Sequence, residues 1–203
     1  MGIKFFNLTS RNLDNNIYKK IYQKAIPYYK KSRKFDVEHI DWLLSVADQI
    51  VDTENLDAEI FIPLILLHDI GYSEMNSDFW GKDTRKAHME IGAKLTREIL
   101  AEFNYDSLKS QKIVEYIAIH DQWALGNHEI YKNDRLLGIF SDLDFIWMAS
   151  AVGFPFFMVE LGKTKDELID WLLSNEKLVN RPFASISTKQ LFAKLIEQRK
   201  NEY

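Results

Sequence analysis

Apolar residues recur at every third or fourth position through most of this 203-residue chain, and the alternating pattern of strands is rare. Spacing of three and four residues places side chains on one face of an α-helix. Only 8 glycines and 4 prolines interrupt the pattern, and we find no internal repeat or low-complexity tract. The sequence therefore predicts an all-α fold, and its length suits one domain with a sizeable core.

The helix boundaries follow from capping residues and helix breakers. We expect a first helix over about 14–34 that Pro27 kinks or splits, and later helices over about 134–150, 165–173 and 188–200. Each of the other expected helices follows a side chain suited to an N-cap. These are Asp36, Asp57, Asp83 or Thr84, and Asp106. The stretch 73–82 is interpreted as a polar loop, and 153–155 as a break.

The run 60–67 is apolar on every side, which suits a buried strand as well as a buried helix. We predict a helix because the neighbouring segments are helical and because Pro63 is poorly placed in a central strand. His68-Asp69-Ile70 follows the run, and Gly71 is expected to end the helix.

Composition and charge narrow the class of protein. The formal net charge is -4, which does not favour general nucleic-acid binding, and we interpret the basic run Lys30, Lys31, Arg33 and Lys34 as a solvated helix end. The chain has no cysteine, which excludes disulfides, thiolate metal sites and cysteine nucleophiles. Residues 1–10 lack a signal-peptide pattern and no apolar run is long enough to span a bilayer, so we expect a cytoplasmic protein without a membrane partner.

Three of the five histidines, His39, His88 and His120, lie in or beside the apolar stripes of different expected helices, and a fourth, His68, ends the buried helix. Packing such helices together directs these side chains into one interior, where polar groups need partners. A lone histidine on a stripe is usually a hydrogen-bonded core residue, and that interpretation suits His88 or His120 taken singly. The set as a whole favours a divalent cation as the common partner.

These residues resemble, in order, the motifs of the HD superfamily of metal-dependent phosphohydrolases. The matching segments are Glu38-His39, Leu66-Leu67-His68-Asp69-Ile70-Gly71, His88 with Gly92-Ala93, Ile119-His120, and Asp142-Leu143-Asp144. The most specific piece is the apolar run that ends in LLHDIGY with a histidine one helix upstream. The resemblance covers about 36–150. It implies a single helical domain over 1–203. The metal-binding core lies at about 36–150, with additional helices N-terminal to it and a C-terminal helical elaboration at about 155–203.

The same resemblance implies the metal ligands. They are His39, His68, Asp69 and a downstream aspartate that is either Asp142 or Asp144. We favour Asp144, because Asp144-Phe145-Ile146 fits the family pattern of an aspartate, a variable residue and an apolar residue better than Asp142-Leu143 does.

His88 and His120 stand where family members with two metal ions carry extra ligands, and Asp69 would then bridge the ions. The alternative is that both histidines contact substrate phosphate beside a single ion. We expect one or two divalent ions, drawn from Mn, Fe, Mg, Co and Ni.

The expected reaction is hydrolysis of a phosphate ester or anhydride by attack of a metal-bound water. Asp69, His88 and His120 are the expected catalytic residues, and the resemblance implies a nucleotide or another small phosphorylated metabolite as substrate. Arg85 and Lys86, close to His88, are candidates for binding its phosphate, although a solvated helix start explains either one equally well. His128 could donate a proton to a leaving group, although we interpret it as a surface histidine, and Asp121 is a candidate contact to a metal ligand or to the substrate.

Two rival functions remain open from the ligand set. Some HD-fold proteins use the same ligands to hold two irons that activate dioxygen, and others are non-catalytic regulatory domains. No phosphate-binding glycine loop or GxSxG motif is present, which argues against a P-loop enzyme and an α/β hydrolase. The substrate, the physiological metal and the oligomeric state, a homodimer included, are left open.

Overall fold

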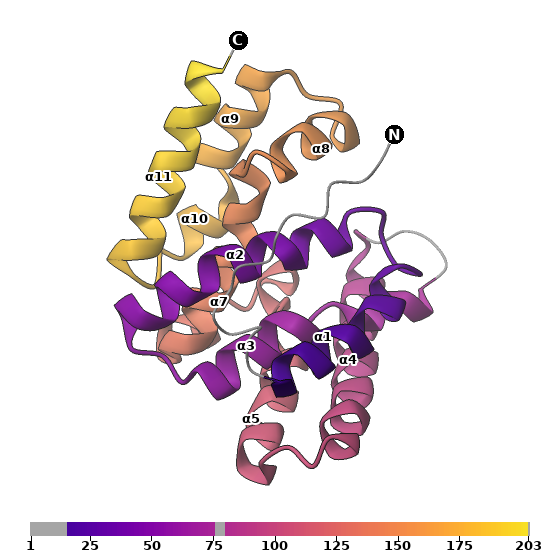
Figure 1. Cartoon of the computed structure of the whole chain (residues 1–203). Helices are drawn as coiled ribbons and strands as arrows, with labels where there is room; N and C mark the ends of the chain where they lie inside the picture. The colour runs from indigo at the N-terminus through magenta and orange to yellow at the C-terminus, as the bar shows by residue number, and fades with distance from the viewer. Residues whose placement is uncertain (1–15, 76–79, 203) are drawn as a thin grey trace.

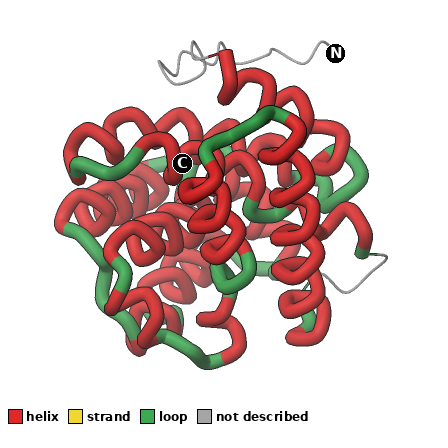
Figure 2. The backbone as a smooth tube through the Cα atoms, turned by 90° about the horizontal axis from the view of Figure 1, so that it is seen from below, coloured by secondary structure: helices red, strands yellow, loops and turns green. Residues whose placement is uncertain are grey.

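The computed structural model describes residues 16–75 and 80–202. Within these ranges every regular element is a helix and there is no strand, which confirms the all-α prediction (Figure 2). No single helix there is both long and apolar enough to cross a membrane. Among the described residues, only the helical segments 135–149 and 153–160 are together long and apolar enough for this, and they are bent by 74° relative to each other.

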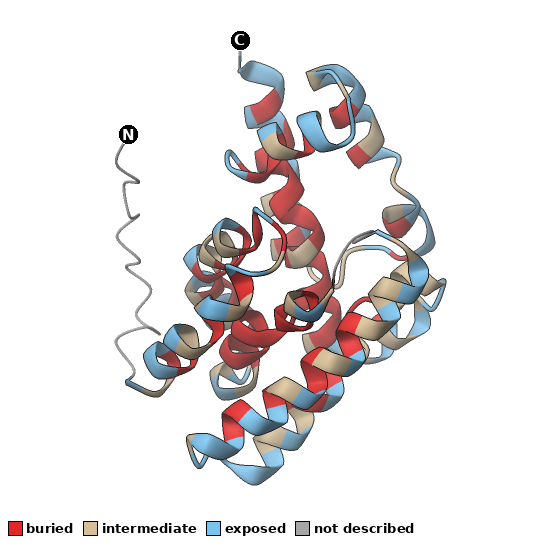
Figure 3. Cartoon of the chain, turned by 90° about the vertical axis from the view of Figure 1, so that its right-hand side faces the viewer, coloured by how far each residue is buried: buried red, intermediate tan, exposed pale blue. Residues whose placement is uncertain are grey.

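The N-terminal part of the chain builds the core around one apolar helix. Its elements are α1 (Asn16–Tyr29), α2 (Asp36–Glu54), α3 (Ala58–Leu67), the short 3-10 helix η2 (Ile70–Glu74), α4 (Lys82–Glu102) and α5 (Ser107–Ile117). The residues of α3 from Phe61 onwards are buried, and α1, α2, α5 and α7 pack around this helix (Figures 1 and 3). The apolar run 60–67 is therefore helical, which confirms the prediction of a helix rather than a strand.

The rest of the chain covers one end of this core. Its elements are η3 (Gln122–Leu125), α6 (Glu129–Asn133), α7 (Arg135–Ile146), η4 (Trp147–Ala149), α8 (Gly153–Glu160), α9 (Lys165–Leu173), α10 (Glu176–Asn180) and α11 (Ile186–Asn201). Helix α11 packs against α2, α7 and α9, at the upper left in Figure 1. The expected helix 165–173 matches α9 in both bounds.

Several expected helix starts and stops differ from the structure. The first helix ends at Tyr29, two residues after Pro27, and Asp14 lies outside the described residues. Asp57 and Asp106 cap α3 and α5 as predicted, by accepting from the amides of Glu59 and Lys109. The other predicted caps are wrong, because α2 begins at Asp36 itself and α4 begins one residue before Asp83.

Gly71 does not end α3, which stops at Leu67; instead it lies inside η2 where that element crosses α4. A Cβ atom at position 71 would lie 2.0 Å from the carbonyl oxygen of His88 and 2.7 Å from the amide nitrogen of Gly92. Glycine is therefore needed for close backbone approach rather than for a helix cap. This contact fixes His88 relative to the segment that carries His68 and Asp69.

Candidate metal centre

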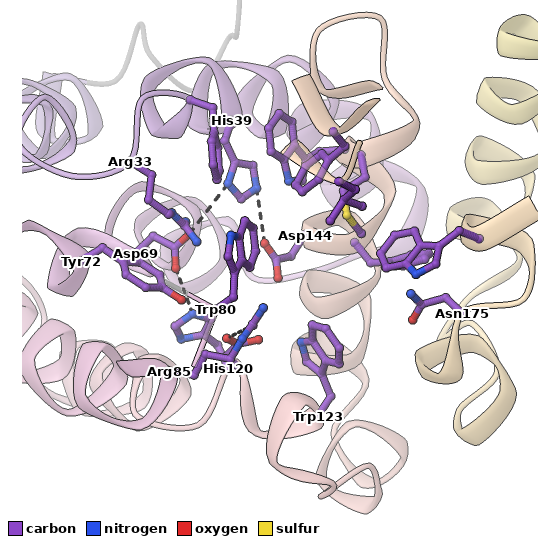
Figure 4. Close-up of a pocket in the computed structure, with 18 of the residues that line it drawn as sticks. Arg33, His39, Asp69, Tyr72, Trp80, Arg85, His120, Trp123, Asp144 and Asn175 are labelled. Carbon is purple, nitrogen blue, oxygen red and sulfur yellow. Dashed lines mark hydrogen bonds and ion pairs between the residues drawn. The ribbon is translucent and has the colours of Figure 1, made fainter. Parts of the chain in front are cut away.

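The four histidines and Asp69 come together from four segments of the chain. His39 lies in the first turns of α2, His68 caps α3, His88 lies in α4, and His120 follows α5. Each of these histidines, and Asp69 directly after His68, is at most 5% exposed. Figure 4 shows His39, Asp69, His120 and Asp144 facing a common space.

The carboxylate of Asp69 lies between two pairs of histidines. Its Oδ2 atom is 3.2 Å from Nε2 of His68 and 3.9 Å from Nδ1 of His39. Its Oδ1 atom is 3.3 Å from Nε2 of His120 and 3.6 Å from Nε2 of His88. Asp69 thus belongs to two groups of three side chains, each compact enough to hold a metal ion.

The two aspartates of α7 point in different directions. Oδ1 of Asp144 lies 3.3 Å from Nε2 of His39 and 3.8 Å from Nε2 of His68. Asp142 is buried elsewhere, in an ion pair of 2.7 Å with Nη2 of Arg181. Residues two apart on a helix point about 200° away from each other, so one helix can serve both the centre and the core. The structure places Asp144, and not Asp142, beside the histidines.

Backbone carbonyls fix the tautomers of two of the rings. Nδ1 of His68 donates to the carbonyl oxygen of Ile65 at 2.9 Å, and Nδ1 of His120 donates to that of Ile117 at 2.8 Å. A carbonyl can only accept, so in the neutral rings the lone pair is on Nε2, which faces Asp69. This is the arrangement that a metal-ligating imidazole needs.

Several ring nitrogens of these histidines make no well-aligned hydrogen bond with the described residues, although Nε2 of His39 and Nε2 of His68 lie near carboxylate oxygens. The nitrogens concerned are both nitrogens of His39, Nε2 of His68 and Nδ1 of His88. Unpaired buried polar atoms are costly, at about 1–3 kcal/mol each. A cation bound by His39, His68, Asp69 and Asp144 would satisfy Nε2 of His68 and one nitrogen of His39, so the residues present fit a metal ion.

The ionisation of the cluster is strongly perturbed. Burial would raise the pKa of Asp69, but Arg33 and His68 lower that pKa well below its usual range. Burial lowers the pKa of His68, but Asp69 and Asp144 raise it to about 9. Burial and the neighbouring His120 lower the pKa of His88 well below its ordinary value. These shifts favour an anionic Asp69 and a neutral His88, and protons compete with a metal ion for the histidine nitrogens of such a site.

Arg33 is the clearest difference from the sequence interpretation. It is buried rather than solvated, and its guanidinium pairs with both Asp36 and Asp69. The lysines beside it in the basic run are exposed, as expected. The prediction of a solvated helix end is therefore wrong for Arg33 alone.

The two residues predicted to bind phosphate lie apart. Arg85 lines the cavity at the centre, where it is paired with the buried Asp121. Lys86 is exposed and does not line this cavity. His128 is half-buried and also lies away from the cavity.

The cavity beside the centre has a volume of about 500 Å³, and His39, Asp69, His120 and Asp144 form part of its wall. Four of the five tryptophans of the chain, Trp80, Trp123, Trp147 and Trp171, also line it, and Figure 4 labels the first two. The ring of Trp147 stacks on His39 at 4.5 Å between centroids. Sequence reasoning missed this aromatic wall, because its members come from four separate segments.

Comparison of the chain with family models, with curated proteins and with solved structures yields no match.

Proposed function

We propose that this chain is a metal-dependent phosphohydrolase of the HD superfamily. The observation that carries the proposal is the position of Asp69, with one carboxylate oxygen toward His39 and His68 and the other toward His88 and His120. A carboxylate that faces two nitrogen-ligand sets is suited to bridging two cations. The order of the motifs along the sequence adds independent support.

The ligand roles follow from the distances. His39, His68, Asp69 and Asp144 would hold one cation, and Asp69, His88 and His120 a second. Bound divalent cations acidify water and neutralise the charge of a phosphoryl group. The chain itself contributes a buried anionic Asp69 and the neutral His88, with the carbonyls of Ile65 and Ile117 holding the rings of His68 and His120.

The lining of the cavity favours a substrate whose negative charge lies beside the metal centre. Arg33 and Arg85 are the cationic side chains that line it among the described residues, and each is already paired with a buried aspartate. Beyond the centre the wall is largely aromatic, and flat apolar groups stack well on such rings. These features favour a small phosphate ester with a planar body, such as a nucleotide, over a chain of several phosphates.

The test combines metal analysis with an activity panel on one sample. The purified protein is analysed for bound metals and then assayed against phosphomonoesters with and without aromatic groups, phosphodiesters and nucleoside triphosphates. We expect His68→Ala and Asp69→Ala to lose bound metal and hydrolysis while remaining folded. His128→Ala is the matched control, because this histidine lies outside the cavity, and it should retain both.

Two results would overturn the proposal. Full metal occupancy in both His68→Ala and Asp69→Ala would show that the pair is structural. Bound iron with oxygen consumption and no hydrolysis of any phosphate compound would assign the centre to an oxygenase instead.

A further inference from the structure

Arg33 is held rigidly at the edge of the centre by contacts on several sides. Its Nε donates to Oδ1 of Asp36 at 2.8 Å, and its backbone amide donates to Oδ2 of the same carboxylate at 3.1 Å. Its Nη2 donates to Oδ2 of Asp69. The guanidinium also lies over the ring of Tyr72, 3.9 Å from the centroid, and Tyr72 stacks on His88.

The oxygen of Asp69 that Arg33 contacts is the one that faces His68 and His39. It is therefore the oxygen that would ligate a cation held by these two histidines. A carboxylate oxygen has two lone pairs, so it can bind a cation and still accept from Nη2. The positive charges of the guanidinium and of the cation, however, would then repel each other inside a buried site.

We propose that Arg33 is a positioning residue of this centre whose positive charge balances Asp69 and weakens the binding of a divalent cation there. The inference rests on the proposed metal centre but not on the reaction that the centre performs. In the metal-free chain Arg33 stabilises the anionic form of Asp69. A cation that binds Asp69 competes with this interaction, so Arg33 lowers the affinity for the cation. Asp36, which is fully buried, offsets part of the charge of Arg33.

A role in orientation alone makes the opposite prediction for metal affinity. Residues that orient metal ligands typically change affinity by about 10–100-fold when they are removed, and in the weakening direction. Here Asp69 has other restraints, because it follows the cap of α3 directly and its Oδ1 lies within hydrogen-bond distance of Nε2 of His120. We therefore expect the charge of Arg33 to outweigh its orienting effect.

The experiment is a titration of each metal-free protein with Mn²⁺ alone, followed by the electron paramagnetic resonance signal of the free ion. Arg33→Gln removes the charge but keeps an N–H donor, and it should bind Mn²⁺ about tenfold or more tightly. Arg33→Lys keeps the charge and should stay within about threefold of the wild type. Asp36→Asn leaves Arg33 less neutralised and should bind about tenfold more weakly.

Arg85→Gln is the matched control. Arg85 lines the same cavity and is paired with a buried aspartate, but that aspartate belongs to neither metal-binding group. Its Mn²⁺ affinity should stay within about threefold of the wild type. Circular dichroism of each variant shows whether it is folded, and if Arg33→Gln is not, Arg33→Met, which also removes the charge, takes its place with the same expected gain in Mn²⁺ affinity.

Unchanged or weaker Mn²⁺ binding in a folded Arg33→Gln would overturn the inference, as would unchanged or tighter binding in Asp36→Asn. An equal gain in Arg33→Gln and Arg85→Gln would also overturn it, because the effect would then be one of overall charge. Failure of the wild type to bind Mn²⁺, or any other divalent ion, would instead remove the metal centre and with it the proposed function.

Discussion

The Nε2 atoms of His88 and His120 lie 3.2 Å apart, and both are within 3.6 Å of Oδ1 of Asp69. The proton of a neutral His120 is on Nδ1, because this atom donates to the carbonyl oxygen of Ile117. Its Nε2 therefore directs a lone pair toward the same point as the Asp69 carboxylate. Such a convergence of acceptors needs a positive partner, either a proton or a cation.

Replacing His88 separates the two interpretations of this cluster. If two cations bind, His88→Ala should lower the stoichiometry of bound Mn²⁺ from about two toward about one, because the ligands of the first ion remain. If one cation binds and His88 contacts phosphate, the stoichiometry should stay the same and inorganic phosphate should bind more weakly. Isothermal titration with each ligand measures both quantities. A variant unchanged in both would place His88 outside the functional site.

Replacing Asp144 and replacing Asp142 should affect different properties of the protein, metal affinity in the first case and stability in the second. Asp144→Asn should weaken Mn²⁺ binding, with a small effect on the free energy of unfolding of the metal-free protein. Asp142→Asn should leave the affinity nearly unchanged but destabilise the fold by about 3 kcal/mol, because it leaves the buried Arg181 without its counter-charge. Denaturant unfolding and Mn²⁺ titration of both variants test this. The reverse pattern would identify Asp142 as the metal ligand.

The all-α fold followed from the three-four spacing, because a helix that buries one face must repeat apolar residues with that period. The same spacing put His88 and His120 on core-facing stripes, and the structure shows their rings in contact with one another. Asp142 and Asp144 lie only two positions apart, so the sequence pattern could only favour one of them. The packing of α10 and α11, which bring Arg181 and Thr188 to Asp142, separates them.

The role of Arg33 could not be predicted, because its neighbours Lys30, Lys31 and Lys34 are exposed and only the turn between α1 and α2 directs Arg33 inward. Gly71 was misinterpreted for a similar reason. A glycine after a buried helix is typical of a C-cap, and the close approach of α4 is visible only in the tertiary structure. Contacts between segments distant in sequence thus determined what local patterns left ambiguous.

Gly71→Ala tests the close contact between η2 and α4. The added Cβ would overlap the backbone of His88 and Gly92, so the two elements must separate, and we expect a loss of about 3 kcal/mol in the free energy of unfolding. Metal affinity should fall as well, since His88 would move relative to Asp69. Denaturant unfolding and Mn²⁺ titration measure these changes.

Gly92→Ala is the control for that experiment. The nearest atom to a Cβ at position 92 is a side-chain carbon of Ile117 at 3.3 Å, which can yield slightly, and alanine favours the helix by about 1 kcal/mol. We expect little or no loss of stability from this change. Equal destabilisation by both substitutions would show that the backbone contact at Gly71 has no special importance.

Lys177 is a fully buried lysine whose ionisation should make stability depend on pH. Its ammonium donates to the carbonyl oxygen of Ser141 and lies 5.0 Å from the ring centroid of Trp123. Burial lowers the pKa of Lys177 from 10.5 to about 7, although Asp144 acts to raise it. Between these two values the unfolded chain holds a proton that the folded chain does not, so the free energy of unfolding rises with pH through this window.

Lys177→Met removes this contribution and leaves the other titrating groups in place. The stability of the wild type relative to Lys177→Met should therefore increase from about pH 7 toward pH 10 and stay constant below about pH 6. Urea denaturation of both proteins in the presence of EDTA measures the difference without interference from bound metal. Lys189→Met, which removes an exposed lysine of α11, controls for the loss of one charge. A stability difference that does not change with pH would show that Lys177 keeps its proton throughout this range in the folded protein.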